Sequence, residues 1–309
     1  MRFLRLAALL CACLISPPAL AGDATYLLVL GIAQDAGYPQ AGCYRPHCQP
    51  GWDDPDRRRL ASSVAVIDEA GGATYLIDAT PDIRHQLYRL NRAAPGDAFA
   101  LRGVFPTHGH IGHYTGLMHF GFEAMNAEAV PVYALPRMKE FLSSNGPWDQ
   151  LVRYRNIELR PLEADSAVQL APRLSVTPFE VPHRDEYTET AGFRIDGPER
   201  SAVYIPDIDK WDRWTIDIRE VVGSVDYALI DATFFADGEI PGRDMADIPH
   251  PFVEESMALL ADLSPEERGR VYFIHMNHTN PLLQDGSEAE RIVRGKGFRV
   301  AREGLRLDL

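Results

Sequence analysis

The sequence predicts one α/β domain built from two mixed β-sheets that are covered by outer helices. Three observations support this fold: apolar strand-like runs meander in two groups, helical stretches lie between them, and no linker interrupts the series. A single doubly wound sheet would instead show a regular alternation of strand and helix. Apolar residues make up 46% of the chain and charged residues 24%, which is the mix of a folded rather than a disordered protein.

The first 21 residues have the layout of a secretory signal peptide. Arg2 and Arg5 precede a short apolar run, a Pro-Pro break and a small-residue Ala-Leu-Ala cleavage site. The apolar run is too short to span a bilayer. We therefore expect a signal peptide at 1–21 and one mature domain at 22–309, periplasmic or secreted, with no integral membrane segment. A lipoprotein anchored at Cys13 is the alternative.

The charge of the chain narrows the choice of partners. Removal of the two signal-peptide arginines changes the formal net charge from −13 to −15. A chain this acidic is poorly suited to binding nucleic acid through its phosphates, so we expect a small-molecule substrate. An anionic substrate would need local positive charge, such as a metal ion.

The first part of the predicted domain begins with a buried strand and ends at a cluster of histidines. The Gly- and Pro-rich residues 33–59 predict an irregular loop, and Gly71-Gly72 between two apolar runs predicts a hairpin. Thr80 and Pro81 are typical of a helix start. The predicted elements are strands at 25–31, 61–68 and 73–79, a helix at 82–92 and a strand at 102–108.

The second part of the chain continues the pattern of strands and helices. An amphipathic pattern predicts a helix at 251–263, and an apolar run predicts a central strand at 270–278. The other predicted elements are helices at 116–125 and 136–144, strands at 130–136, 156–163, 174–183, 190–196, 201–209 and 227–235, and a C-terminal hairpin at 298–309.

The stretch PTHGHIGHYTGL, residues 106–117, contains three histidines within six positions. Alternate side chains of an extended segment point the same way, so His108 and His110 can face one ion. His113 lies at the entrance to a helix and can turn toward a neighbouring position. Polar loop histidines are the alternative, but three of them at the end of an apolar strand favour a metal site.

Polar residues follow several other apolar strands. They are Asp78, His183, Asp207 and His275. Singly, each could be a helix cap or a hydrogen-bonded loop residue. Repeated after several strands, they indicate a metal site along one rim of a sandwich.

The order Asp, His-x-His-x-x-His, His, Asp, His, each after a strand, resembles the metallo-β-lactamase fold superfamily. The resemblance covers essentially the whole mature chain and implies an αββα sandwich with one or two metal ions. The segments LGIAQDAGYPQAGC, LIDATPDIRHQL, HIGHYTGL and FIHMNHTNPLL resemble the pyrroloquinoline quinone (PQQ) biosynthesis protein B family. The loop of paired cysteines also resembles that of related cyclic phosphodiesterases.

The resemblance implies a role for each residue of the rim. The implied ligands of a first ion are His108, His110 and His183. The implied ligands of a second position are His113 and His275, with Asp207 as the bridge. Asp78 would orient the histidine loop, a role that metal-bound histidines commonly need.

Gly112 departs from the superfamily pattern His-x-His-x-Asp-His, in which the Asp is a ligand of the second metal. Without that carboxylate we expect zinc at one firm site and a second site that is weak or empty, with iron or manganese as alternatives. The candidate catalytic residues are Asp207, Asp78 and His278. Asp207 is the best remaining carboxylate for proton transfer. His278 is equally compatible with a substitute ligand, a substrate hydrogen-bond donor or a polar turn.

Cys43 and Cys48 remain after signal removal, and three states are open to them. In the phosphodiesterase relatives this loop holds a structural zinc, for which Cys43, Cys48 and His47 would supply three of the four ligands needed. An exported protein could instead close a disulfide between the two cysteines, or keep free thiols.

Together these features predict an exported metal-dependent hydrolase, in which metal-bound water attacks an ester or phosphodiester bond of a small molecule. One alternative is an oxidative role like that of PQQ biosynthesis protein B, which the resemblance links to iron and which export argues against. Another is a non-catalytic metal- or ligand-binding protein. Substrate choice would lie in loops such as 184–190 and 234–250, where no motif names a ligand, and oligomeric state has no signal.

Overall fold

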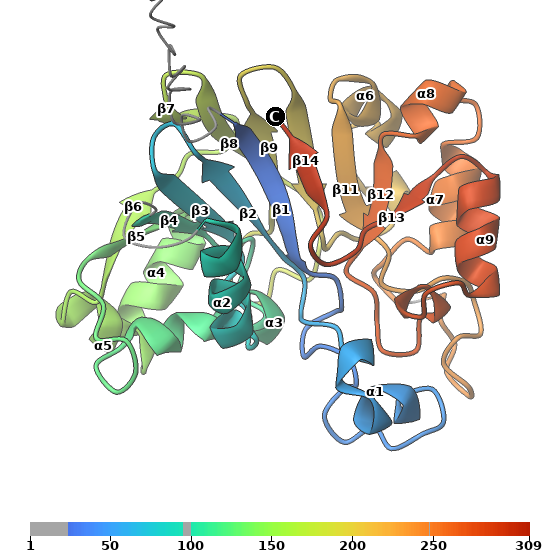
Figure 1. Cartoon of the computed structure of the whole chain (residues 1–309), viewed down its shortest axis with the longest axis horizontal. Coiled ribbons are helices and arrows are strands. Elements are labelled where there is room, and N and C mark those ends of the chain that lie inside the picture. The colour runs from blue at the N-terminus through green and yellow to red at the C-terminus, as the bar shows by residue number, and fades with distance from the viewer. Residues whose placement is uncertain (1–23, 95–99, 247) are drawn as a thin grey trace, which may run out of the picture.

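Two seven-stranded β-sheets pack face to face in the computed structural model, which describes residues 24–94, 100–246 and 248–309 (Figure 1). Helices cover the outer face of each sheet, which confirms the predicted αββα sandwich. The expected signal peptide and the lipoprotein alternative at Cys13 lie outside the described residues. Within the described part of the chain, no helix has the length and apolar character needed to cross a membrane.

The first sheet combines an antiparallel and a parallel half. Strands β14, β1, β2 and β3 pair antiparallel, whereas β3, β4, β5 and β6 pair parallel. The predicted hairpin between β2 and β3 is confirmed. In sheet order the strands are β14 (Arg306–Asp308), β1 (Thr25–Gly31), β2 (Ser63–Asp68), β3 (Ala73–Ile77), β4 (Ala100–Phe105), β5 (Val130–Ala134) and β6 (Ile157–Pro161).

The second sheet is also mixed. Strands β10 to β13 pair parallel, and β7 to β10 pair antiparallel. In sheet order the strands are β13 (Arg299–Val300), β12 (Val271–Ile274), β11 (Tyr227–Asp231), β10 (Ser201–Ile205), β9 (Ala191–Asp196), β8 (Leu174–Glu180) and β7 (Val168–Ala171). Sequence patterns did not predict β7, a short edge strand in which no residue is buried.

The helices form the outer layers. Those beside the first sheet are α2 (Ile83–Ala93), α3 (Ile111–Tyr114), α4 (Pro136–Ser144) and α5 (Trp148–Arg153). Those beside the second sheet are α6 (Ile218–Gly223), α7 (Val253–Leu259), α8 (Pro265–Arg268) and α9 (Glu288–Gly295). Short 3-10 helices are η1 (Pro55–Arg57), η2 (Thr115–Phe120), η3 (Trp211–Arg213) and η4 (Pro281–Leu283).

Side chains of β1 show why the strands read as continuous apolar runs. Leu27 and Val29 face the other sheet, whereas Tyr26, Leu28 and Leu30 face the helices. Successive side chains of a strand point to opposite faces, so a strand buried on both faces must be apolar throughout. The core therefore has one layer between the sheets and another beneath the helices.

Three local predictions were wrong. The helix expected at 116–125 is the 3-10 helix η2, which ends at Phe120 because Gly121 turns to extended backbone. The irregular loop at 33–59 contains a short helix, α1 (Gln49–Asp53), at the tip of a projecting segment (Figure 1). The C-terminal hairpin does not form, because β13 pairs with β12 in one sheet and β14 with β1 in the other.

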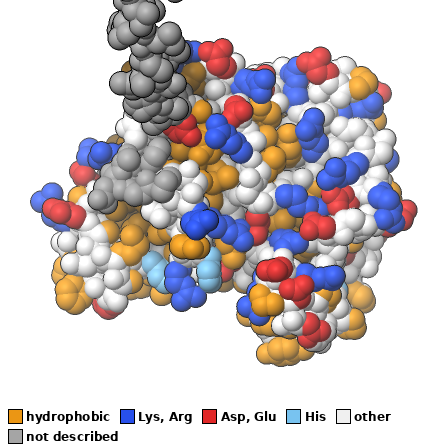
Figure 2. All heavy atoms as spheres, in the orientation of Figure 1, with side chains coloured by type: hydrophobic (Ala, Val, Ile, Leu, Met, Phe, Trp, Pro, Cys, Tyr) orange, Lys and Arg blue, Asp and Glu red, His pale blue; other side chains and the backbone are white. Residues whose placement is uncertain are grey.

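The charged side chains are mixed by sign on the face shown in Figure 2. Lys and Arg side chains alternate with Asp and Glu, and the positive charges do not gather into one patch on this face.

Candidate metal centre

The predicted metal ligands lie just beyond strands of both sheets. His108 and His110 follow β4 of the first sheet, and His113 lies in α3 directly after them. Three strands of the second sheet lead to the others: β8 to His183, β10 to Asp207 and β12 to His275. The strand ends converge at one rim of the sandwich, so residues far apart in sequence form two adjoining groups.

The first group has donor atoms that all lie within 4.8 Å of one another, and consists of His108, His110, His183 and Asp207. His108 Nε2 lies 2.8 Å from His110 Nδ1 and 3.4 Å from Asp207 Oδ2. His183 Nε2 lies 3.3 Å from Asp207 Oδ1. Three imidazole nitrogens and one carboxylate oxygen are a donor set that zinc commonly takes.

Several buried polar atoms of this group have no hydrogen bond. Among the described residues, both ring nitrogens of His183 and Oδ1 of Asp207 are buried without a hydrogen-bond partner. A buried polar atom left in this state costs about 1–3 kcal/mol, so native proteins normally provide a partner. A divalent cation would bind one ring nitrogen of His183 together with a carboxylate oxygen of Asp207. The residues therefore fit a bound metal ion.

Burial keeps most of these histidines in the neutral form that binds a metal. Burial and then the charge of His113 hold the pKa of His108 and of His275 well below the usual value. Burial and then His250 lower the pKa of His183 to about 2. Because a metal binds the deprotonated imidazole, these side chains are prepared for a cation.

The second group contains a residue that sequence analysis did not single out. Asp35, His113 and His275 place their donor atoms within 4.8 Å of one another. His113 Nε2 lies 3.3 Å from His275 Nε2, 3.8 Å from Asp35 Oδ1 and 3.7 Å from Asp207 Oδ2. Oδ2 of Asp207 thus faces both groups.

Asp78 fixes the position of the histidine loop that follows β4. Its fully buried carboxylate accepts a hydrogen bond from the Thr107 N–H at 2.7 Å, and Oδ2 lies 2.8 Å from His113 Nδ1. Although burial lowers the pKa of His113, the nearby Asp78 raises it to about 9. The contact places the proton of His113 on Nδ1 and turns Nε2 toward the second group. Asp78 is therefore a positioning residue.

Asp231 has the equivalent place in the second sheet and was not predicted. Its buried carboxylate accepts hydrogen bonds from the N–H of Ile208 and from the N–H and hydroxyl of Thr233. His250 Nδ1 lies 2.9 Å from Asp231 Oδ2 and 3.2 Å from Asp207 Oδ1. His250, the last residue of the loop at 234–250 in which the sequence places substrate choice, thus joins Asp231 to the metal centre.

A pentapeptide that occurs twice in the sequence could have pointed to Asp231. LIDAT occurs at 76–80, where Asp78 directly follows β3, and again at 229–233, where Asp231 ends β11. The hydroxyl of Thr233 in the second copy lies 3.0 Å from His275 Nδ1. Each copy therefore orients a histidine of the second group, and the repeat itself could have identified Asp231.

The backbone is left-handed at three residues of the centre. Asp35, Asp78 and His275 have φ angles of 42°, 66° and 68°. Such angles are uncommon for residues other than glycine and persist where the surrounding structure requires them. Here they turn the side chains toward the rim.

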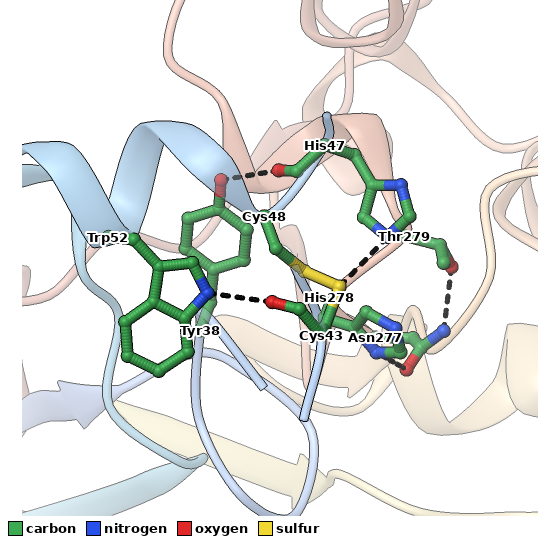
Figure 3. Close-up of a disulfide and its surroundings, with 8 residues drawn as sticks. All are labelled: Tyr38, Cys43, His47, Cys48, Trp52, Asn277, His278 and Thr279. Atoms are coloured by element: carbon green, nitrogen blue, oxygen red, sulfur yellow. Dashed lines mark hydrogen bonds between the residues drawn. A yellow bond between two sulfur atoms is a disulfide. The ribbon is translucent and has the colours of Figure 1, made fainter. Parts of the chain in front are cut away.

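His278 lies away from the two groups, beside a disulfide (Figure 3). Its ring is 5.5 Å from that of His47, and its Nδ1 lies 2.9 Å from Asn277 Oδ1. Cys43 and Cys48 are joined by a disulfide, so the zinc and free-thiol alternatives do not apply in this structure. The donors of His47 and His278 lie within 4.8 Å of the two sulfurs, but the disulfide leaves no thiolate to bind a metal.

A cleft of about 460 Å³ opens beside the metal centre. Asp35 and His110 lie on its metal-centre side, and Arg184 contributes a positive charge. Its aromatic lining residues are Tyr114, Phe141, Trp148 and Tyr187. Arg184 and Tyr187 come from the loop at 184–190, one of the segments in which the sequence places substrate choice. The cleft is large enough for a small molecule.

The chain is similar to curated proteins along nearly its whole length. It is 29% identical over 308 residues to the coenzyme PQQ synthesis protein B of Methylobacterium sp. (strain 4-46), covering 91% of this chain and 99% of the relative. The corresponding protein of Xanthomonas campestris pv. campestris (strain B100) is 27% identical over 307 residues, which cover 92% of this chain and 99% of that protein.

Solved structures share the architecture. The crystal structure of Zn²⁺-bound PqqB from Methylobacterium extorquens superposes with a TM-score of 0.77 at 26% identity, covering 92% of this chain and all of that one. A diphosphatase from the PhnP family gives a TM-score of 0.66 at 25% identity, covering 92% of this chain and 97% of that one. A family profile described as a beta-lactamase superfamily domain matches residues 73–276. The chain therefore belongs to the beta-lactamase superfamily.

Proposed function

We propose that the chain is a zinc-dependent hydrolase that cleaves an ester or phosphodiester bond of a small molecule. The observation that carries the proposal is the first group, whose buried donor atoms on His183 and Asp207 lack hydrogen-bond partners beside an open cleft. When bound, a divalent ion makes water acidic near neutral pH and stabilises developing negative charge.

The side chains around the ion divide the remaining tasks. His108, His110 and His183 would hold it, with the outer nitrogen of His110 fixed by Glu186 at 2.8 Å. Asp207 has an oxygen free of hydrogen bonds, and burial raises the pKa of this carboxyl to about 7. Oδ2 of Asp207 faces the ligand His108, which leaves Oδ1 as the oxygen placed to accept a proton, and His250 Nδ1 lies 3.2 Å away to share it.

The cleft indicates the type of substrate. Aromatic rings on its walls favour a flat apolar portion, and Arg184 favours a negative charge. We infer a small ester or phosphodiester that has an aromatic or heterocyclic group next to the bond that is cleaved.

The test is hydrolysis of a panel of aryl esters and aryl phosphodiesters by protein purified without an affinity metal. Activity should be lost on chelation, return with zinc, and fall at least about 100-fold in His110→Ala, since a ligand on the cleft side is removed. His119→Ala, at a half-buried histidine of η2 that belongs to neither group, is the matched control and should keep full activity. Zinc binding without turnover of any substrate in the panel would instead indicate a non-catalytic binding protein.

A role in PQQ synthesis is the second candidate, and the similarity to PQQ synthesis protein B over 91% of this chain favours it. Nitrogen and oxygen donors suit iron as well as zinc. Elemental analysis of the same protein separates the two candidates. Zinc together with hydrolysis of the panel supports the first candidate, whereas stoichiometric iron together with absent hydrolysis supports the oxidative role.

We also propose that the protein is exported and begins at Gly22 after signal cleavage. The Cys43–Cys48 disulfide supports this, because such bonds persist in oxidising compartments. Expression in a Gram-negative host should give a periplasmic protein whose intact mass corresponds to residues 22–309, reduced by two hydrogens for the disulfide. A cytoplasmic protein that retains residues 1–21 would contradict export.

A further inference from the structure

We propose that Asp35 is the carboxylate ligand of a second metal ion, held together with His113 and His275, and that Gly112 is the residue that makes room for it. The inference rests on the proposed function, because it completes the same metal centre. It replaces the weak or empty second site expected from sequence with a site that has its own acidic ligand.

Steric contacts show that Asp35 occupies the space of a side chain at position 112. A Cβ added to Gly112 would lie 2.4 Å from both Cα and Oδ1 of Asp35 and 3.0 Å from its Cβ. Real Cβ atoms do not approach other atoms so closely, so any residue larger than glycine would displace Asp35. A carboxylate is therefore present at this point, although it comes from another part of the chain.

Backbone hydrogen bonds fix Asp35 relative to the histidine on the opposite side. The N–H of Gln34 donates to the carbonyl of Met276 at 2.8 Å, and the N–H of Met276 donates to the carbonyl of Ile32 at 2.8 Å. Met276 directly follows His275, so two ligands of the second group lie on segments that are bonded to each other. Such an arrangement holds donor atoms in place before an ion binds.

The side chains of the second group face one another with a ligand-like chemistry. His113 and His275 are almost fully buried, whereas the Asp35 side chain is 40% exposed and lines the cleft. Each histidine has its Nδ1 occupied, by Asp78 or by Thr233, which leaves both Nε2 atoms facing the carboxylate side. Two oriented imidazoles and an open carboxylate resemble the ligands of a catalytic site that keeps a position for substrate.

A second ion here would change what the cleft can bind. Asp35 and His110 border the cleft together, so ions in the two groups would present positive charge along that side. In a chain with a formal net charge of −13, this is a local means of attracting an anionic group such as a phosphodiester. The second ion would thus favour phosphodiesters over neutral esters.

The test counts metal ions rather than product. Wild type, Asp35→Ala and Asp35→Asn are stripped with a chelator and titrated with Zn²⁺ against a chromophoric chelator, followed by elemental analysis. Wild type should bind two zinc ions, and both variants should keep the first step and weaken the second at least about tenfold. Asp56→Ala, an exposed carboxylate of the same loop, should behave as wild type.

A variant at Gly112 tests the same site by displacing the Asp35 carboxylate instead of removing it. Gly112→Ala leaves the carboxylate in the chain but forces it away, so it should weaken the same second step. Melting of the metal-free variants at the wild-type temperature shows that they are folded. A single zinc ion in wild type, or two zinc ions held with wild-type affinity in Asp35→Ala, overturns the proposal whether or not the protein hydrolyses anything. If zinc binds to wild type in two steps, the second of which needs Asp35, but no substrate is hydrolysed, Asp35 is supported as a metal ligand and the proposed hydrolase reaction is rejected.

Discussion

Asp207→Asn should reduce hydrolysis at least about 1,000-fold, because one substitution removes both a charged ligand and the proton acceptor. Oδ2 of Asp207 faces His108 and His113, and Oδ1 faces His183, so the carboxylate touches both groups of the centre. Asparagine has nearly the same shape but no charge, and its amide is a poor metal ligand. Initial rates on the best substrate, together with the zinc content, measure the effect.

Melting of metal-free Asp207→Asn shows whether a loss of activity comes from the metal centre or from a loss of folding. Asp207 is a buried carboxylate with one oxygen that lacks a hydrogen bond, which disfavours the metal-free fold. Metal-free Asp207→Asn should therefore melt at a temperature no lower than metal-free wild type, while zinc should stabilise it much less. Asp209→Asn is the matched control, since Asp209 pairs with Arg213 instead. A variant that keeps both activity and zinc would show that Asp207 is not a ligand.

Asp231→Ala should lower the free energy of unfolding by about 3–5 kcal/mol, the typical result of removing one partner from a buried charged pair. The carboxylate partners His250 and accepts three hydrogen bonds from Ile208 and Thr233, all of which would be left without it. Urea unfolding of the metal-free protein measures the loss. The metal-loaded variant should also lose activity, because Ile208 directly follows Asp207.

Asp308→Ala provides the contrast for Asp231. Asp308 is an exposed residue of β14 that pairs with Arg306, and a surface ion pair contributes about 0–1 kcal/mol. A loss below about 1 kcal/mol in Asp231→Ala would contradict the structural role assigned to the buried carboxylate. If Asp231→Ala loses the expected free energy of unfolding but keeps wild-type zinc affinity, Asp231 contributes to the stability of the fold and not to metal binding.

The metal ligands that could be predicted from sequence are those whose position follows from a local pattern of residues. His183, Asp207 and His275 each follow an apolar strand, and the sandwich brings strand ends to one rim. Asp35 could not be predicted in this way, because it lies in the irregular segment 33–59. Its position depends on hydrogen bonds to residues near Met276, more than two hundred positions away, which no local pattern records.

The fold shows the same limit. The pattern at 298–309 correctly indicated two strands, yet it could not indicate that they join different sheets. That choice is made by backbone bonds between Ala301 and Phe273 on one side and between Gly304 and Val29 on the other. Cys43 and Cys48 were likewise ambiguous, since spacing alone fits a disulfide, a metal site or free thiols.

The pairing of β14 with β1 also bears on the order in which the protein is made. β1 receives β14 as a neighbour only when Arg306–Asp308 have been translated, long after β1 itself. Until then one edge of β1 lacks this partner, and an open strand edge is a surface on which nascent chains associate. Residues 307–309, with Leu307 and Leu309 buried in the core, thus complete one edge of the first sheet. A chain truncated before Arg306 would keep every predicted metal ligand but leave this edge of β1 without β14.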